Sequence, residues 1–183
     1  VATETGMCVL SLGGGQDSRT ELDADDASML YGDLALALKD GKFYVLYYMG
    51  IAEFGPDGKA ARVCYGPEKW SFFTSMLEVD GHIYAAVGDG MNGGGSLCEL
   101  DTEAMSLTSI DTGELGVKAL GLSAEGGLLL SGSLGGRDIV AALGEGEPTE
   151  LFDWAEPGVA IVSCLGIWEQ PDGSYILYQP GDT

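Results

Sequence analysis

Residues 72–88 read FFTSMLEVDGHIYAAVG, two runs of alternating apolar residues joined by Asp80-Gly81. Apolar residues at every second position indicate a strand with one buried face. Asp-Gly between two such runs is the strongest short signal for a hairpin, because the turn needs positive φ angles at its centre. Three more copies of this pattern occur, two with Asp-Gly at the turn and one with Glu125-Gly126. The turn glycines lie 40, 45 and 47 residues apart and are Gly41, Gly81, Gly126 and Gly173.

A second, less apolar set of hairpins alternates with the first. Their turns fall in 51–64, 96–110 and 138–152, and one of the same kind opens the chain at 7–22. Each repeat therefore holds two hairpins, or four short antiparallel strands, in 40 to 47 residues, which is typical of one β-propeller blade. The more apolar hairpin is expected on the inner side, packed between neighbouring blades. We predict an all-β chain, a propeller of about four four-stranded blades.

The blades are predicted to form a single domain over residues 1–183. The repeat units are placed at about 31–66, 70–112, 116–153 and 158–183, the last completed by 7–23. Pairing of the first and last hairpins would close a four-bladed ring and hide the strand edges that otherwise invite aggregation. Two alternatives stay open: an arc of a larger propeller, and a β-sandwich, which is also built from regularly spaced short strands.

The four hairpins and the strand pair at 100–110, which begins Leu100-Asp101-Thr102, resemble generic bacterial β-propeller repeats over nearly the whole chain. Acidic, Asp-Gly-rich repeats of this kind resemble propeller segments of secreted or lipid-anchored bacterial proteins, some of them fused to solute-binding domains. The resemblance implies an extracellular or cell-surface location, by secretion or through a lipid anchor of the full-length protein.

The charge balance narrows the classes of partner. The chain has 8 Lys and Arg against 29 Asp and Glu, a formal net charge of −21. Such a charge argues against nucleic-acid phosphates or an anionic membrane as the main partner. No run of about 18 apolar residues is present, so no membrane span is predicted. The oligomeric state is left open.

Residues 88–93 read GDGMNG, the G-x-G-x-x-G spacing of a dinucleotide-binding loop. Such a site needs a helix that begins at the third glycine, so that its N-terminus faces the phosphates. The residues after Gly93 read instead as a glycine linker and a strand. We therefore interpret 88–95 as a loop between two antiparallel strands, with Gly135 at the equivalent place one blade on, and its glycines as a source of backbone freedom.

Propellers usually bind ligands at one rim, where such loops meet. Exposed tryptophans in the loops before the inner hairpins can stack on a sugar or a peptide side chain. The alternative is that both indole rings cover the blade ends as part of the core. The candidate ligand-binding residues are Asp89, Asn92, Arg137, Asp138, Trp70 and Trp154.

Signals for a metal, a cofactor or catalysis are weak. The acidic run 21–26 lacks the glycine and glutamate spacing of an EF-hand, so a solvated loop is favoured over calcium binding. His82 is the only histidine and suits a surface or strand-end position better than a zinc site or a triad. No cofactor, metal ligand or catalytic residue is predicted. The four cysteines lack a C-x-x-C spacing and are predicted to be small buried thiols, with disulfide pairing left open; they are Cys8, Cys64, Cys98 and Cys164.

These observations favour a non-catalytic binding or interaction module of a secreted or cell-surface bacterial protein. Its ligand would be a small molecule, a glycan or a peptide or protein, bound at the loop rim. One alternative is a carbohydrate-active enzyme with paired carboxylates, which 29 acidic residues leave unassigned. Another is a structural propeller segment of a larger protein of the solute-binding type.

Overall fold

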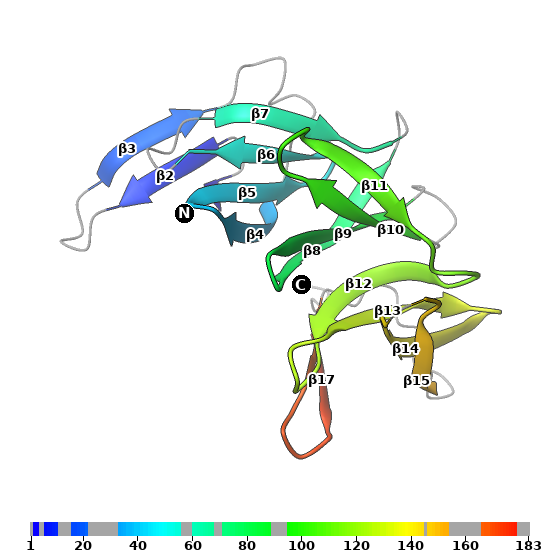
Figure 1. Ribbon diagram of the computed structural model, residues 1–183. Helices are drawn as coiled ribbons and strands as arrows, with labels where there is room; N and C mark the ends of the chain where they lie inside the picture. Colours follow the sequence, from blue (N-terminus) through cyan, green and yellow to red (C-terminus); the bar gives the residue numbers. More distant parts are fainter. Residues whose placement is uncertain are drawn as a thin grey trace, which may run out of the picture.

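The computed structural model describes residues 2–3, 6–10, 16–21, 33–55, 60–67, 71–88, 95–144, 146–153 and 166–178. Every regular element among these residues is a β-strand. The strands form four sheets that follow one another along an arc in the order of the sequence (Figure 1). The described part of the chain holds no helix of the length and apolarity that a membrane crossing requires.

The first two complete sheets are four-stranded antiparallel meanders, in which each strand pairs with the next along the chain. The first sheet comprises β4 (Asp33–Lys39), β5 (Lys42–Tyr47), β6 (Gly50–Phe54) and β7 (Ala60–Tyr65). The second comprises β8 (Phe72–Val79), β9 (His82–Gly88), β10 (Gly95–Asp101) and β11 (Ser106–Ile110).

The third sheet has six strands in the order β15-β14-β13-β12-β16-β17. Its first four strands form another meander, and β16 then pairs in parallel with β12 through Gly121 and Ile167. The strands are β12 (Gly116–Leu122), β13 (Leu128–Leu134), β14 (Arg137–Ala142), β15 (Thr149–Asp153), β16 (Gly166–Glu169) and β17 (Tyr175–Tyr178). A separate three-stranded sheet is formed by β1 (Ala2–Thr3), β2 (Gly6–Leu10) and β3 (Gln16–Glu21).

The predicted Asp-Gly hairpins are confirmed. Asp40 and Asp80 have φ angles of 51°, and the following Gly41 and Gly81 have φ angles of 73° and 82°. Positive φ at both central residues is the backbone of the two-residue hairpin turn, whose twist matches that of the strands. In the second sheet this turn fixes the register by pairing Val79 with His82.

The core lies between successive sheets. Tyr44 and Ile51 of the first sheet meet Phe73 and Ile83 of the second in one buried cluster. A second cluster joins the second and third sheets. The first strands of neighbouring sheets contact one another, β4 with β8 and β8 with β12, while β11 and β15 are largely exposed. The more apolar hairpin of each sheet therefore lies on the inner side, as expected.

A buried ion-pair network ties the first sheet to the second. Glu53 on β6 is only 2% exposed and accepts hydrogen bonds from Lys42, Tyr44 and Arg62 at 2.6–3.3 Å. Arg62 also donates to the main-chain oxygen of Thr102, at 2.7 Å, in the turn between β10 and β11. The Arg62 guanidinium thus donates hydrogen bonds both to the buried Glu53 carboxylate and to the backbone of the neighbouring sheet.

The number of blades stays a prediction. Among the described residues β17 pairs with β16, β16 also pairs with β12, and β2 pairs with β1 and β3, so no strand pairing joins the last hairpin to the first. The predicted fourth blade, in which residues 7–23 complete the unit at 158–183, is therefore not seen among these strand pairings.

Candidate functional site

The glycine-rich stretch 88–95 joins two antiparallel strands, as predicted. β9 ends at Gly88, β10 begins at Gly95, and these two glycines are direct antiparallel partners. Residues 89–94 lie outside the described residues. Because a strand starts two positions after Gly93, the stretch lacks the long helix that a dinucleotide site requires there.

Glycine is needed at position 95 for a different reason from the one expected. A Cβ atom at Gly95 would collide with the main-chain oxygen of Val117, on β12 of the next sheet, and would lie 2.8 Å from that of Val87. The residue therefore permits close approach of two sheets. At Gly135 and Gly136 the expected reason holds, since their φ angles are 58° and 79° in a two-residue turn.

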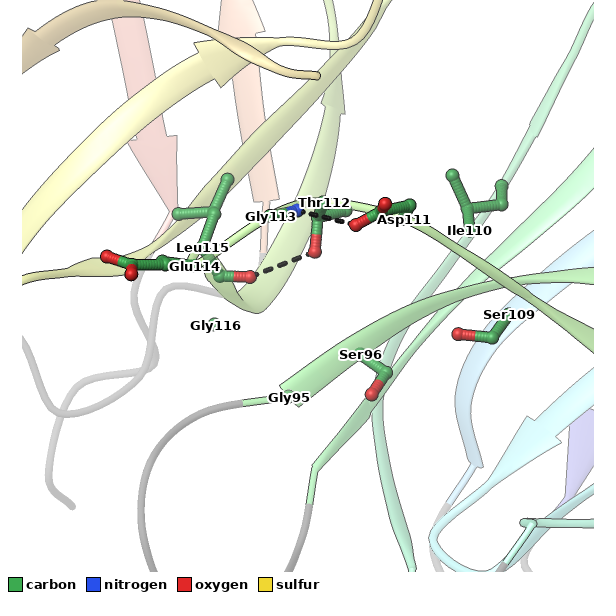
Figure 2. A pocket seen from close by; sticks show the side chains of 10 residues that line it. All are labelled: Gly95, Ser96, Ser109, Ile110, Asp111, Thr112, Gly113, Glu114, Leu115 and Gly116. Carbon is green, nitrogen blue, oxygen red and sulfur yellow. Dashed lines mark hydrogen bonds between the residues drawn. The ribbon is translucent and has the colours of Figure 1, made fainter. Parts of the chain in front are cut away.

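A cavity of about 510 Å³ opens where the start of β10 meets the connection from β11 to β12 (Figure 2). The last residues of β9, the first residues of β10 and the connection after β11 lie at the same edge of the sheet. The pairing shows this, because Leu97 near the start of β10 pairs with Ala86 near the end of β9 and with Ile110 at the end of β11. The cavity is lined by Gly95, Ser96, Ser109, Ile110, Asp111, Thr112, Gly113, Glu114, Leu115 and Gly116.

Local hydrogen bonds hold the connection between β11 and β12 in shape. The Asp111 carboxylate accepts a hydrogen bond from the amide of Gly113 at 2.9 Å, and the Thr112 hydroxyl donates to the oxygen of Leu115 at 3.0 Å (Figure 2). Gly113 has a φ of 60°, which favours glycine there. The buried Leu115 anchors the connection to the core between the second and third sheets.

A second, smaller cavity of about 100 Å³ adjoins the same connection. Residues 112–115 line both cavities. The smaller cavity extends to Ile139 and Glu150 of the third sheet.

Two of the predicted rim residues, Arg137 and Asp138, already have ion-pair partners. Arg137 makes two hydrogen bonds to Glu150, at 2.9 and 3.0 Å, and lies 3.5 Å from Asp153. Asp138 accepts a hydrogen bond from Lys118 at 2.8 Å. As neighbours on β14, Arg137 and Asp138 point to opposite faces of the sheet. Ligand binding by either stays a prediction.

The other candidates fall on residues that the structure does not describe. They are Asp89, Asn92, Trp70 and Trp154, together with residues 22–26 of the acidic run.

Sequence reasoning missed the polar residues that line the large cavity. Their only local signal is Asp111-Thr112-Gly113 directly after a strand, the composition of an Asx turn. That signal predicts a turn, and it says nothing of a cavity against the next sheet.

His82 and two cysteines occupy structural positions. His82 begins β9 and its Nδ1 lies 2.5 Å from the Glu99 carboxylate on the surface, as expected of a strand-end histidine. Cys64 and Cys98 are free, buried thiols in the core between the first two sheets, and burial raises the pKa of both. The side chains of Cys8 and Cys164 lie outside the described residues. Within those residues no cluster of His, Cys, Asp and Glu is suited to a metal ion.

No protein-family model matches the sequence, and neither does any curated protein. Solved structures do resemble the chain, although it spans 61% or less of their lengths. Hydrazine synthase of Kuenenia stuttgartiensis has a TM-score of 0.62 at 9% identity, with 92% of this chain and 54% of that chain covered.

Two further structures share the architecture. The extracellular domain of BT4673 from B. thetaiotaomicron has a TM-score of 0.60 at 14% identity, over 95% of this chain and 24% of that chain. The Dos1 propeller has a TM-score of 0.57 at 14% identity, over 91% of this chain and 45% of that one. At such low identities these likenesses establish a propeller-like all-β fold and only a weak resemblance to individual propeller proteins.

Proposed function

We propose that the protein is a non-catalytic binding or interaction module whose ligand sits at the loop edge of the second and third sheets. The cavity of about 510 Å³ beside Gly95 and residues 109–116 is the observation that carries this proposal. It lies where loops from two sheets meet, which is where propeller-like folds usually place a binding site.

The lining of the cavity favours a neutral or cationic polar ligand. Three hydroxyl groups and two carboxylates line it, and no Lys, Arg or His is among the lining residues. The carboxylates of Asp111 and Glu114, in a chain of net charge −21, would repel an anion. A glycan or a peptide that donates hydrogen bonds suits this chemistry.

The proposed setting is a secreted or cell-surface bacterial protein. Its support is the likeness to a structure described as an extracellular domain of B. thetaiotaomicron, together with the acidic composition. The enzyme with paired carboxylates and the structural segment of a larger protein both stay predictions.

A cavity-filling substitution tests the site. Ligand binding would be sought with panels of glycans, peptides and small molecules, by the rise in unfolding temperature of the 183-residue chain. Ser96→Tyr puts a large side chain into the cavity at an exposed strand position and should abolish the rise. Ser106→Tyr is the matched control, because Ser106 is exposed at the opposite end of the same sheet.

Two results would contradict the proposal. One is the absence of a shift with every class of ligand. The other is a ligand whose shift is the same in Ser96→Tyr as in the unsubstituted chain, which would place binding elsewhere.

A further inference from the structure

The outer strand of the second sheet, β11, has one open edge. β11 pairs with β10 along one side, and no strand of the described residues pairs with its other side. Its sequence is SLTSI, and Ser106, Thr108 and Ser109 are exposed. Every second residue of an edge strand turns its main-chain N–H and C=O groups away from the sheet. Within the described part of the chain, β11 therefore presents main-chain donors and acceptors that a further strand can pair with.

The outer strands of the other two four-stranded meanders are protected against such pairing. β7 carries Arg62 and β15 carries Glu150, and the register of each strand with its neighbour is shifted by a bulge. Charges and bulges are features that keep edge strands from pairing with another chain. β11 has neither, because all of its residues are uncharged and its ladder with β10 has no register shift.

The open edge of β11 ends at the large cavity. Ser109 and Ile110 are the last two residues of the strand, and both line the cavity together with the connection that follows (Figure 2). Asp111 and Glu114 are exposed and supply two carboxylates at this end. A strand added antiparallel to β11 would begin here, so its N-terminal residues would lie beside these carboxylates.

We propose that an extended peptide segment of a partner protein adds to β11 as a fifth, antiparallel strand, and that a lysine or arginine near its N-terminal end enters the cavity. This inference rests on the proposed function and names the ligand class. Main-chain hydrogen bonds to β11 supply affinity, and the cavity at the end of the strand supplies selectivity. The antiparallel direction continues the sheet, in which every strand is antiparallel to its neighbours.

Charge complementarity favours a basic peptide as the occupant. The carboxylates of Asp111 and Glu114 attract a cationic side chain, and the net charge of −21 attracts the whole peptide. A second copy of the chain carries the same net charge, so repulsion opposes the pairing of two β11 edges. A glycan lacks the regularly spaced main-chain groups that match a strand edge.

Two synthetic peptides of equal composition test the direction and the charge. The probe is Lys-Lys-Thr-Val-Thr-Val-Thr with both ends blocked, and the control is the reversed sequence Thr-Val-Thr-Val-Thr-Lys-Lys. Amide chemical shifts of the isotopically labelled 183-residue chain measure both affinities. The probe should bind about tenfold more tightly than its reverse, which can bring its lysines to the cavity only as a parallel strand. Equal affinities, or no binding of the probe, would overturn the proposal.

Methylation of main-chain nitrogens separates strand addition from simple occupation of the cavity. Only every second N–H group of an added strand faces β11. Two probes are therefore methylated on alternate sets of residues in the Thr-Val part. One should bind about tenfold more weakly than the unmethylated probe, through loss of hydrogen bonds, and the other should bind as before. Equal affinities of the two methylated probes would overturn strand addition.

Variants of the chain locate the N-terminal end of the peptide. Glu114→Gln should weaken the probe several-fold, whereas Glu103→Gln is the matched control, because Glu103 is exposed in the turn at the other end of β11. A loss of affinity in Glu103→Gln alone would reverse the direction and overturn the proposal. A chain that already forms a dimer, seen by light scattering and abolished by Thr108→Lys, would assign the edge to a second copy and would also overturn it.

Ser96→Tyr distinguishes failure of this inference from failure of the proposed function. If Ser96→Tyr abolishes binding of a ligand but the methylated probes behave alike, the cavity is a binding site and only strand addition is wrong. If the methylated probes differ but Ser96→Tyr leaves the affinity unchanged, binding does not use the cavity, and both proposals are wrong. We expect the methylated probes to differ and Ser96→Tyr to weaken the probe.

Discussion

Glu53 provides the sharpest test of how the first two sheets are held together. Glu53→Gln keeps the shape of the side chain and removes its charge. The carboxylate is 2% exposed and accepts hydrogen bonds from Lys42, Tyr44 and Arg62, the last through two nitrogen atoms. In glutamine an NH₂ group replaces one of the two carboxylate oxygens. This group cannot accept the hydrogen bonds that Lys42, Tyr44 and Arg62 donate.

We expect Glu53→Gln to lower the free energy of unfolding by about 2 kcal/mol. Leaving a buried charge without its partner costs roughly 3–5 kcal/mol. Loss of an ordinary hydrogen bond costs about 1 kcal/mol. The expected value lies between these, because the side chains of Arg62 and Lys42 are 37% and 44% exposed and can turn to water once the carboxylate is neutralised. For a domain of this size the unfolding temperature should fall by about 4–8 °C.

Denaturant and thermal unfolding measure this change, with Glu150→Gln as the control. Glu150 makes the same two-nitrogen contact with Arg137, but on the surface, with its side chain 36% exposed. Exposed ion pairs contribute little, so Glu150→Gln should change the unfolding temperature much less. Equal shifts in the two variants would refute the reasoning, since burial would then not decide the strength of the pair.

Three other outcomes are expected. Burial acts to raise the pKa of Glu53, but its hydrogen bonds outweigh burial and lower that pKa. The charged carboxylate therefore stabilises the fold above the unfolded pKa of about 4.3, and this stabilisation is lost as the pH falls through the folded pKa. The free energy of unfolding of Glu53→Gln, measured as a function of pH, should therefore fall less steeply in acid than that of the unsubstituted protein. Gly95→Ala should destabilise the protein by about 1–3 kcal/mol in denaturant unfolding through a backbone collision, whereas Gly144→Ala, with open space at its Cβ position, should be nearly neutral. Cys64 and Cys98 should resist alkylation until the protein unfolds, because burial raises the pKa of both thiols and blocks access to them. Peptide mass spectrometry measures the labelling, and rapid labelling of either cysteine in the folded protein would contradict this expectation.

Local patterns predicted the hairpins because the forces that form them are local. The Asp40-Gly41 and Asp80-Gly81 turns adopt the positive φ angles that the sequence indicates. The alternation beside Asp80-Gly81 buries Phe73 and Ile83, whereas in β4 the exposed face carries Leu36 and Leu38. The same local reasoning argues against a dinucleotide site at residues 88–93, and β10 begins at Gly95, where the sequence predicts a strand.

The site could be predicted only in part, because it depends on how separate sheets approach one another. The edge of the sheets that carries the cavity was expected, but its lining from Ser96 to Gly116 was not, since no local pattern marks it. Arg137 and Asp138 are adjacent in sequence and were expected to act together, yet strand geometry turns them to opposite faces and to separate ion partners.

The sequence by itself determined an all-β chain of repeated hairpins, because strand alternation and turn chemistry operate over a few residues. Only the tertiary structure decided why residue 95 is glycine, which buried carboxylate meets a guanidinium, and which apolar faces stay exposed. Each of these depends on contacts between residues far apart in the chain, such as Arg62 with Thr102 and Gly95 with Val117. Such contacts follow from the placement of one sheet against the next, which no short stretch of sequence specifies.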